Sequence, residues 1–108
     1  MKPSIELIST LGDGDDAKKE SYKNPSGLAS DSDGNIIVAD SGNHRVLKID
    51  QAGILCWELG RKNSDGLNSA GTAQGEFNSP QGVCIDTDGS IWVADTGNCR
   101  IQKLNSSE

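Results

Sequence analysis

The sequence has few aromatic residues and no long apolar run. Of its 108 residues, only Tyr22, Trp57, Phe77 and Trp92 are aromatic, so a core must rest on isoleucine, leucine, valine and alanine. No apolar stretch approaches the roughly 20 residues of a membrane-spanning helix. We therefore expect residues 1–108 to form a single small domain that does not cross a membrane.

Positive charge is also scarce. Ten Lys and Arg residues oppose 16 Asp and Glu residues, a formal net charge of −6. This balance argues against a protein that binds nucleic acid by neutralising many phosphates, and against docking on an anionic membrane. The polar start of the chain, from Met1 to Glu6, interrupts any apolar stretch, so no signal peptide is expected in this sequence. The protein is expected either to be cytoplasmic, which is favoured, or to have had a leader removed.

Residues that serve catalysis or metal binding are few. The three cysteines, Cys56, Cys84 and Cys99, form no C-x-x-C pair, so neither a disulfide framework nor a zinc site is expected. They are predicted to act as small buried apolar side chains. His44 is the only histidine, and nothing in the spacing suggests a nucleophilic triad. We expect no catalytic residue, no metal and no cofactor. The alternative is a metal held by three copies of His44 in a symmetric channel.

An internal repeat organises the chain. Residues 24–50 align with residues 79–105 without a gap, at an offset of 55, and 13 of the 27 positions are identical. Each copy contains an Asp-x-Asp-Gly segment that resembles half of a calcium loop. The later ligands of such a loop are absent, so these segments are predicted to be turns.

Each repeat has the pattern of short strands separated by turns. In the first copy, strands are predicted at 27–31, 35–40, 44–49 and 54–60, and Gly34 supplies the positive φ of a tight hairpin. No segment has a 3.6-residue period. Repeats of about 40–50 residues with four strands each are typical of β-propeller blades. The predicted fold is therefore all-β, with one blade at 24–60 and a second at 77–105 that has only three strands.

The missing strand is predicted at the other end of the chain. The pattern Leu7-x-x-x-Leu11-Gly12 matches Leu55-x-x-x-Leu59-Gly60, so residues 5–12 are predicted to be an outer strand. Two blades cannot close a ring. Residues 5–12 are therefore expected to complete the second blade of a neighbouring chain, and three head-to-tail chains would give six blades.

The repeat resembles the NHL repeat. The second copy carries Phe77-x-x-Pro80-x-Gly82-Val83, followed by a segment from Asp88 to Ile101 that keeps the family pattern. The first copy has the signature triplet Asn43-His44-Arg45, whereas Cys99 replaces the histidine in the second copy. The resemblance implies a six-bladed propeller, although family members usually carry all of their blades in one chain.

Motif residues divide into structural and binding candidates. Asp40 and Asp95 end a strand, where they are expected to accept N–H bonds from the turn. Arg45 and Arg100 follow five residues later, and each is expected to pair with an acidic group of its own blade or of the next blade. Trp57 and Trp92 are expected to pack between blades. Loops 13–24, 41–44, 61–79 and 96–99 should share one end, and turns 31–35, 50–53 and 86–90 the other. The long loops favour binding at the first end, with these candidates: Tyr22, Asn43, His44, Arg45, Arg61, Lys62, Asn98 and Arg100.

A strong scaffold motif without a catalytic constellation favours a non-enzymatic module. We expect it to assemble with itself and to present loops to a protein partner. Three alternatives remain open: a metal-dependent lyase or hydrolase, as in some related six-bladed propellers; an RNA-binding domain, as in some NHL proteins; and a self-assembling propeller unit without a ligand. RNA binding is disfavoured because acids slightly outnumber bases at the loop-bearing end.

Overall fold

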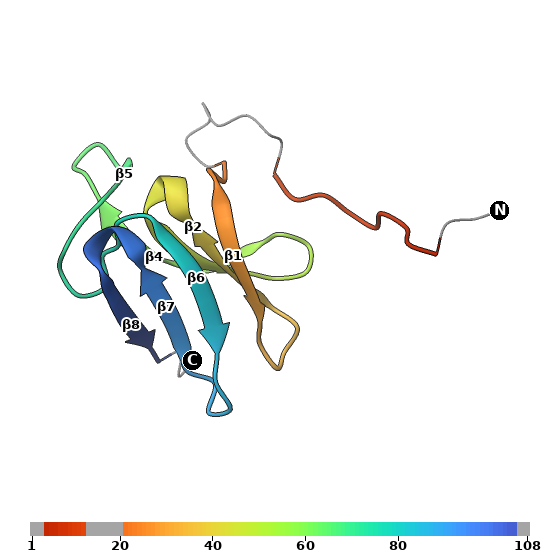
Figure 1. Ribbon diagram of the computed structural model, residues 1–108. Helices are drawn as coiled ribbons and strands as arrows, with labels where there is room; N and C mark the ends of the chain where they lie inside the picture. The colour runs from red at the N-terminus through yellow and green to blue at the C-terminus, as the bar shows by residue number, and fades with distance from the viewer. Residues whose placement is uncertain (1–3, 13–20, 106–108) are drawn as a thin grey trace.

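The computed structural model describes residues 4–12 and 21–105, and these form two antiparallel sheets (Figure 1). The first sheet has the order β1-β2-β3-β4-β5, and the second has the order β6-β7-β8. The all-β prediction is confirmed. Among the described residues, no helix has the length and apolar character needed to cross a bilayer. The strands are β1 (Pro25–Ser30), β2 (Ile36–Asp40), β3 (Arg45–Ile49), β4 (Leu55–Lys62), β5 (Asn68–Ser69), β6 (Pro80–Ile85), β7 (Ile91–Asp95) and β8 (Arg100–Leu104).

The two sheets share the 55-residue offset in their registers. Asp40 pairs with Arg45 across β2 and β3, as Asp95 pairs with Arg100 across β7 and β8. The first sheet differs from the prediction at its outer edge, because β4 continues past Gly60 to Lys62 and pairs with β5. Gly66, with φ of +81°, permits the tight turn between these two strands. A hairpin therefore extends the first sheet toward the loop-bearing end.

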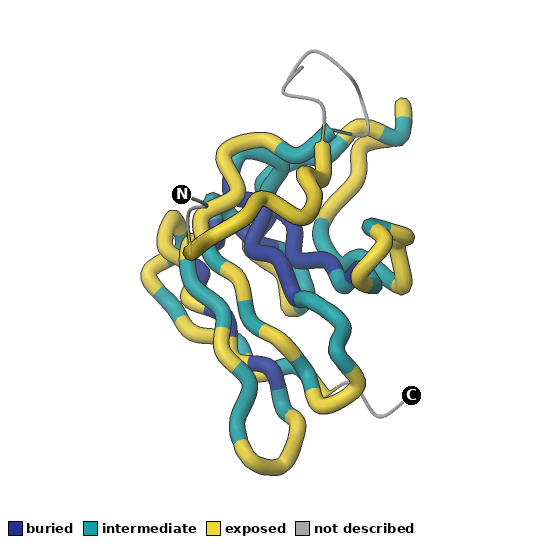
Figure 2. Tube along the Cα trace, turned by 90° about the vertical axis from the view of Figure 1, so that its right-hand side faces the viewer, coloured by how far each residue is buried: buried dark blue, intermediate teal, exposed yellow. Residues whose placement is uncertain are grey.

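The main core lies between the two sheets. Ile37 and Val46 from the first sheet meet Phe77, Ile91 and Val93 from the second part of the chain, and all five are nearly inaccessible to solvent. Figure 2 shows these buried segments in the interior of the molecule. A second cluster covers the opposite side of the first sheet and consists of Val38, Leu47 and Ile49, with Tyr22 and Ile36 packed against it. Apolar side chains on both sides of β2 thus explain its continuous apolar run.

The N-terminal segment pairs with no described strand, although Leu11 at its end lies next to the first sheet. Residues 4–12 form no strand within the single chain and extend away from the body on the β1 side (Figure 1). Ile5, Leu7 and Ile8 are each at least 84% exposed. No described strand pairs with the outer edge of β8. The pairing of residues 5–12 with a neighbouring chain stays a prediction.

The prediction of buried cysteines is wrong. Cys56, Cys84 and Cys99 are free thiols, and all three are exposed. Cys84 occupies the position of Ala29, which packs against the main core, but no described segment covers the side of the second sheet that carries Cys84. Trp92 is exposed on the same side, whereas Trp57 packs against the main core. Equivalent positions therefore differ in burial because only one sheet has a neighbour on that side.

Candidate binding surface

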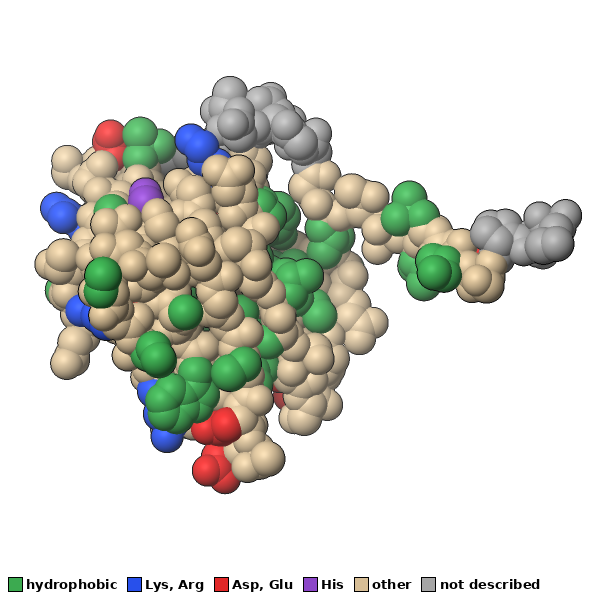
Figure 3. All heavy atoms as spheres, in the orientation of Figure 1, with side chains coloured by type: hydrophobic (Ala, Val, Ile, Leu, Met, Phe, Trp, Pro, Cys, Tyr) green, Lys and Arg blue, Asp and Glu red, His purple; other side chains and the backbone are tan. Residues whose placement is uncertain are grey.

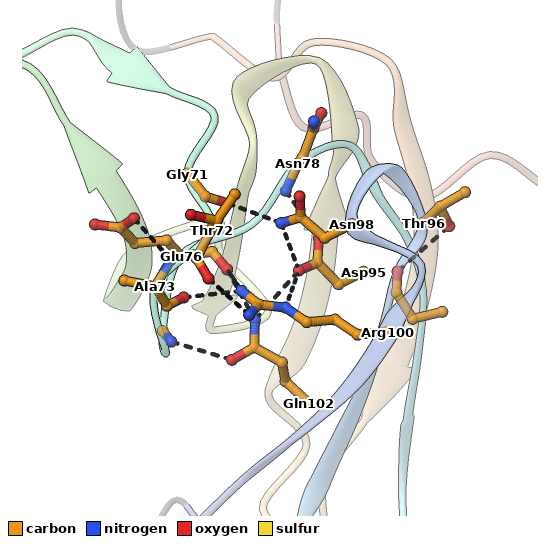
Figure 4. Close-up of polar contacts among 12 residues, drawn as sticks. Gly71, Thr72, Ala73, Glu76, Asn78, Asp95, Thr96, Asn98, Arg100 and Gln102 are labelled. Atoms are coloured by element: carbon orange, nitrogen blue, oxygen red, sulfur yellow. Dashed lines mark hydrogen bonds and ion pairs between the residues drawn. The ribbon is translucent and has the colours of Figure 1, made fainter.

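A buried carboxylate organises the loop-bearing end of the second sheet. The Asp95 side chain is fully buried, and its Oδ1 accepts a 2.8 Å hydrogen bond from the backbone N–H of Asn78. Its Oδ2 accepts hydrogen bonds from Nε of Arg100 at 2.8 Å and from Nδ2 of Asn98 at 3.0 Å (Figure 4). The Asp–Arg pairing thus lies within one sheet. The sequence led us to expect the backbone donor in the turn that follows β7. The structure places it at Asn78, in the segment that enters the sheet.

The first sheet repeats this arrangement. Oδ1 of Asp40 accepts a 2.7 Å hydrogen bond from the backbone N–H of Lys23, which is the counterpart of Asn78. Its Oδ2 accepts from Nε of Arg45 at 2.7 Å and from Nδ2 of Asn43 at 2.9 Å. The same four-residue unit therefore ties the entrance of each sheet to the end of its second strand.

Opposing effects act on the pKa of Asp95. Burial of the carboxylate raises its pKa, because the charged form loses hydration. Hydrogen bonds from Asn78, Asn98 and Arg100, together with the positive charge of Arg100, outweigh that effect and leave the pKa below its ordinary value. The unit is therefore stable with Asp95 ionised.

Arg100 also holds the segment that connects the two sheets. Its Nη1 donates to the carbonyl oxygen of Thr72 at 2.7 Å, and its Nη2 donates to those of Ala73 and Glu76 at 2.8 and 2.9 Å. Nε2 of Gln102 donates to the same Glu76 carbonyl oxygen at 2.8 Å (Figure 4). Gln102 was not among the predicted residues, because the equivalent residue of the first repeat is a leucine.

Asn43, Arg45, Asn98 and Arg100 therefore direct donors into the protein. Asn43 donates to the carbonyl oxygen of Ser21 and Asn98 to that of Gly71, each at 2.8 Å. Arg45 is buried, and its Nη1 lies 3.7 Å from Oε1 of Glu58. These residues shape the loop-bearing end from within.

His44 joins the two sheets. It adopts the left-handed conformation with φ of 52°, and its Nδ1 accepts a 2.9 Å hydrogen bond from the backbone N–H of Ser79. Cys99 has the same backbone conformation at the equivalent position. No group of three or more His, Cys, Asp or Glu residues within 4–12 and 21–105 is arranged to hold a metal ion.

Arg61 and Lys62 are the exposed cationic members of the predicted set. Both lie at the end of β4, next to the turn that leads to β5. Nζ of Lys62 lies 2.8 Å from Oε1 of Glu58 and 2.8 Å from Oδ1 of Asn68. Leu67 is exposed in the same hairpin. We call residues 61–69 the projecting hairpin.

Tyr22 lies in a different region from the other candidates. Its ring packs against the second apolar cluster, on the side of the first sheet that faces away from the second sheet. An apolar groove of about 500 Å³ runs over this side, and Leu11, Tyr22, Leu28, Val38 and Ile49 contribute to its lining. Tyr22 is therefore not part of the projecting hairpin's surface.

The acidic turns at the opposite end are structural, as predicted. Oδ1 of Asp31 accepts 2.9 Å hydrogen bonds from the backbone N–H groups of Asp33 and Asn35, and Asp86 makes the equivalent bonds in the second repeat. Nζ of Lys48 also lies 3.1 Å from Oδ2 of Asp31.

Comparison with known proteins gives the family. The family model of the NHL repeat matches residues 22–49 and 77–104. NHL repeat-containing protein 3 of Homo sapiens is 31% identical over 102 residues, which cover 91% of this chain and 27% of that protein. NHL repeat-containing protein 2 of Homo sapiens is 40% identical over 73 residues, which cover 65% of this chain and 9% of that protein. The chain thus spans about a quarter or less of these relatives.

A solved structure supports the fold. An auxiliary nutrient binding protein from Bacteroides thetaiotaomicron superimposes with a TM-score of 0.56 at 18% identity, covering 75% of this chain and 22% of that one. The resemblance noted in the sequence is confirmed by two matched repeats that coincide with two equivalent sheets. The chain therefore belongs to the NHL repeat family, and its two sheets are blades of the β-propeller type.

Proposed function

We propose that this chain is a non-enzymatic binding module that assembles head-to-tail with further copies of itself and presents its projecting hairpin to a protein partner. The binding proposal is based on which candidate side chains bond within the protein and which contact solvent. Asn43, Asn98 and Arg100 donate inward, whereas Arg61 and Leu67 project from the hairpin and contact solvent. Arginine is enriched at protein–protein interfaces, and Leu67 adds exposed apolar area in the same hairpin.

The charges around the hairpin favour a protein over a nucleic acid. Lys62 lies beside Glu58, and Asp65 follows in the turn, so the surface has both signs of charge. A single-stranded nucleic acid would need a continuous positive groove with stacking aromatic rings. No aromatic residue lies within residues 61–69.

Assembly is supported by two open features of the single chain. β8 has an edge with which no described strand pairs, and residues 5–12 carry exposed apolar side chains. In the first sheet, β3 pairs with β4 through Arg45↔Gly60 and Val46↔Leu59. The 55-residue offset takes Arg45 to Arg100 and Val46 to Ile101, and the match of residues 7–12 with 55–60 takes Gly60 to Gly12 and Leu59 to Leu11. Arg100 would then lie opposite Gly12 of a neighbouring copy, and Ile101 opposite its Leu11. Three copies would then supply six blades.

The binding proposal is tested by affinity capture with two matched variants. Arg61→Ala with Leu67→Ala alters the projecting hairpin, and Asp33→Ala with Asp88→Ala alters exposed turns at the opposite end. We expect the same specific proteins to be retained by the wild type and by the opposite-end variant, and to be lost from the hairpin variant. Equal retention by both variants would contradict binding through the hairpin.

The assembly proposal is tested by absolute mass in solution. The wild type should have the mass of three 11.4 kDa chains, about 34 kDa. Ser9→Pro with Thr10→Pro removes two N–H groups and should give monomers, because proline does not donate to a neighbouring strand. Ser9→Thr with Thr10→Ser keeps both N–H groups and should leave the trimer intact. A wild-type monomer, or a trimer that survives the proline pair, would refute strand exchange.

A further inference from the structure

The contact between the two sheets joins two different sides of the NHL blade. The first sheet contributes the side that carries Ala29, Ile37 and Val46. The second sheet contributes the opposite kind of side, represented by Val83 and Ile91. Because the two sheets are repeats, each of these sides has an equivalent side on the other sheet. Equivalent residues are 55 positions apart in the sequence.

The counterpart on the second sheet has no neighbour among the described residues. Ile101 corresponds to Val46; it is 70% exposed, whereas Val46 is 0% exposed. Trp92 corresponds to the buried Ile37 and is 38% exposed. Figure 3 shows hydrophobic side chains gathered over the three-stranded sheet on this side. We call it the outer face of the second sheet, formed by Cys84, Trp92, Ala94 and Ile101.

The counterpart on the first sheet is open at β1, whereas Val38, Leu47 and Ile49 on the same side are buried. Leu28 corresponds to Val83, which packs against the main core, yet Leu28 is 69% exposed. Ile36 and Val38 correspond to Ile91 and Val93 of the main core, and they line the apolar groove of about 500 Å³. We call this side the outer face of the first sheet, formed by Leu28, Ile36, Val38, Leu47 and Ile49.

We infer that the outer face of the second sheet of one copy docks on the outer face of the first sheet of the next copy. The contact inside the chain is the template: it joins the same two kinds of face, with related side chains at each position. The inference rests on the proposed head-to-tail assembly and names the surfaces through which it forms. Residues 4–12 extend from the β1 side, so the same neighbour meets both the outer face of the first sheet and the N-terminal segment (Figure 1).

A glycine pair supports this docking at atomic detail. A Cβ atom on Gly27 would lie 2.9 Å from the carbonyl oxygen of Gln81 and 3.2 Å from Cα of Gly82, so only glycine permits this approach of β1 to β6. A Cβ on Gly82 would meet only Cβ of Ala94, at 3.6 Å. The single chain therefore has room for a side chain at position 82. In the inferred contact, Gly82 meets β1 of the next copy, as Gly27 meets β6.

The hydroxyl groups at the two contacts are equivalent as well. Ser41 Oγ donates to the carbonyl oxygen of Pro80 across the internal contact. Thr96 is the counterpart of Ser41, and Pro25 is the counterpart of Pro80. In the single chain, Oγ1 of Thr96 makes only a 3.5 Å hydrogen bond to the carbonyl oxygen of Ala94. In the inferred contact it donates to Pro25 of the next copy.

The docking is tested first with Gly82→Val and the matched control Ser64→Val. Both substitutions introduce a valine, but Ser64 lies in the projecting hairpin, away from both outer faces. Light scattering should show a loss from about 34 kDa to 11.4 kDa for Gly82→Val and no change for Ser64→Val. Circular dichroism and thermal unfolding should show that the Gly82→Val chain stays folded. A trimer that survives Gly82→Val would overturn the inferred docking while leaving strand exchange in place.

A mixing experiment tests the pairing of unlike faces. Leu28→Asp places a charge on the outer face of the first sheet, and Ile101→Asp places one on that of the second. Each variant alone should be monomeric. An equimolar mixture keeps one intact pair of faces and should give a 1:1 dimer of two 11.4 kDa chains, about 23 kDa. A mixture that stays monomeric would overturn the inference. A wild-type monomer at high micromolar concentration would overturn the proposed assembly itself.

Discussion

Nδ1 of His44 accepts a 2.9 Å hydrogen bond from the backbone N–H of Ser79, and this bond links the turn of one blade to the entrance of the next. Both residues have a positive φ, 52° for His44 and 51° for Ser79, and their counterparts Cys99 and Asn24 share this conformation. The signature histidine of the first repeat is thus a connector between blades. Cys99 makes no such bond with any of the residues that the structure describes, and its side chain is exposed.

We expect His44→Ala to destabilise the fold by about 1 kcal/mol, because the Ser79 N–H loses its acceptor. Urea unfolding measures the change as a lower midpoint with an unchanged slope. Cys99→Ala is the matched control, because Cys99 has the same backbone conformation as His44 but its side chain accepts no equivalent hydrogen bond from a described residue. This substitution should change the free energy of unfolding by less than about 0.5 kcal/mol. Equal effects of the two substitutions would argue against the role of the histidine in joining the blades.

Phe77→Ala should destabilise the protein by about 3–5 kcal/mol, because the ring is fully buried between the two blades and its removal leaves a cavity. For a domain of this size, the loss is a large fraction of the total stability. Leu67→Ala removes an exposed apolar side chain and should have an effect below about 0.5 kcal/mol. Thermal unfolding of the two variants provides the comparison; similar midpoints would mean that Phe77 is not the centre of the core.

Asp95→Asn should reduce the dependence of stability on acid pH. The pKa of Asp95 in the folded chain lies below its ordinary value, so its stabilisation is present above the unfolded pKa of about 3.9 and is lost as the pH falls through the folded pKa. At neutral pH the variant should lose about 3 kcal/mol, because Arg100 loses its anionic partner. Below about pH 4 the difference from the wild type should shrink.

Chemical denaturation of the wild type and the Asp95→Asn variant between pH 7 and pH 3 measures this change. A difference in unfolding free energy that stays constant over the whole range would contradict the prediction. Asp33→Asn, an exposed turn residue, serves as a control and should leave the pH profile close to that of the wild type.

Gly27→Ala and Gly82→Ala should differ strongly although the residues are equivalent in sequence. A Cβ at Gly27 would lie 2.9 Å from a backbone oxygen, so its addition should destabilise by about 1–3 kcal/mol. A Cβ at Gly82 has room, and the effect should be neutral or slightly stabilising. Both changes are best measured in the Leu28→Asp background, where assembly does not contribute. A comparable loss at both positions would contradict the close approach at Gly27.

The repeated pattern predicted much of the fold because it is local. Alternating apolar residues, Asp-x-Asp-Gly turns and the offset of 55 residues indicate strands and hairpins without any knowledge of their neighbours. The all-β class and the family are confirmed on these grounds. The extension of β4 to Lys62 was missed, because its partner β5 contains only Asn68 and Ser69, which have no strand pattern.

The candidate binding set was less accurate because exposure is not a local property. Arg45 and Arg61 are both cationic residues near loops, yet Arg45 is buried beside Asp40 and Arg61 is exposed on the hairpin. Cys84 and Ala29 have equivalent sequence contexts but opposite environments. A second sheet covers one of them and no described segment covers the other, which the repeat pattern alone does not distinguish.

The sequence by itself determined most of the strands and the turns that interrupt them, because alternating apolar residues and turn geometry connect residues within a few positions. Only the tertiary structure decided which equivalent faces are covered, which donors point inward, and at which glycine a side chain would clash with a neighbouring strand. These features depend on the packing of one sheet against another, and packing depends on distances between segments that lie far apart in the chain.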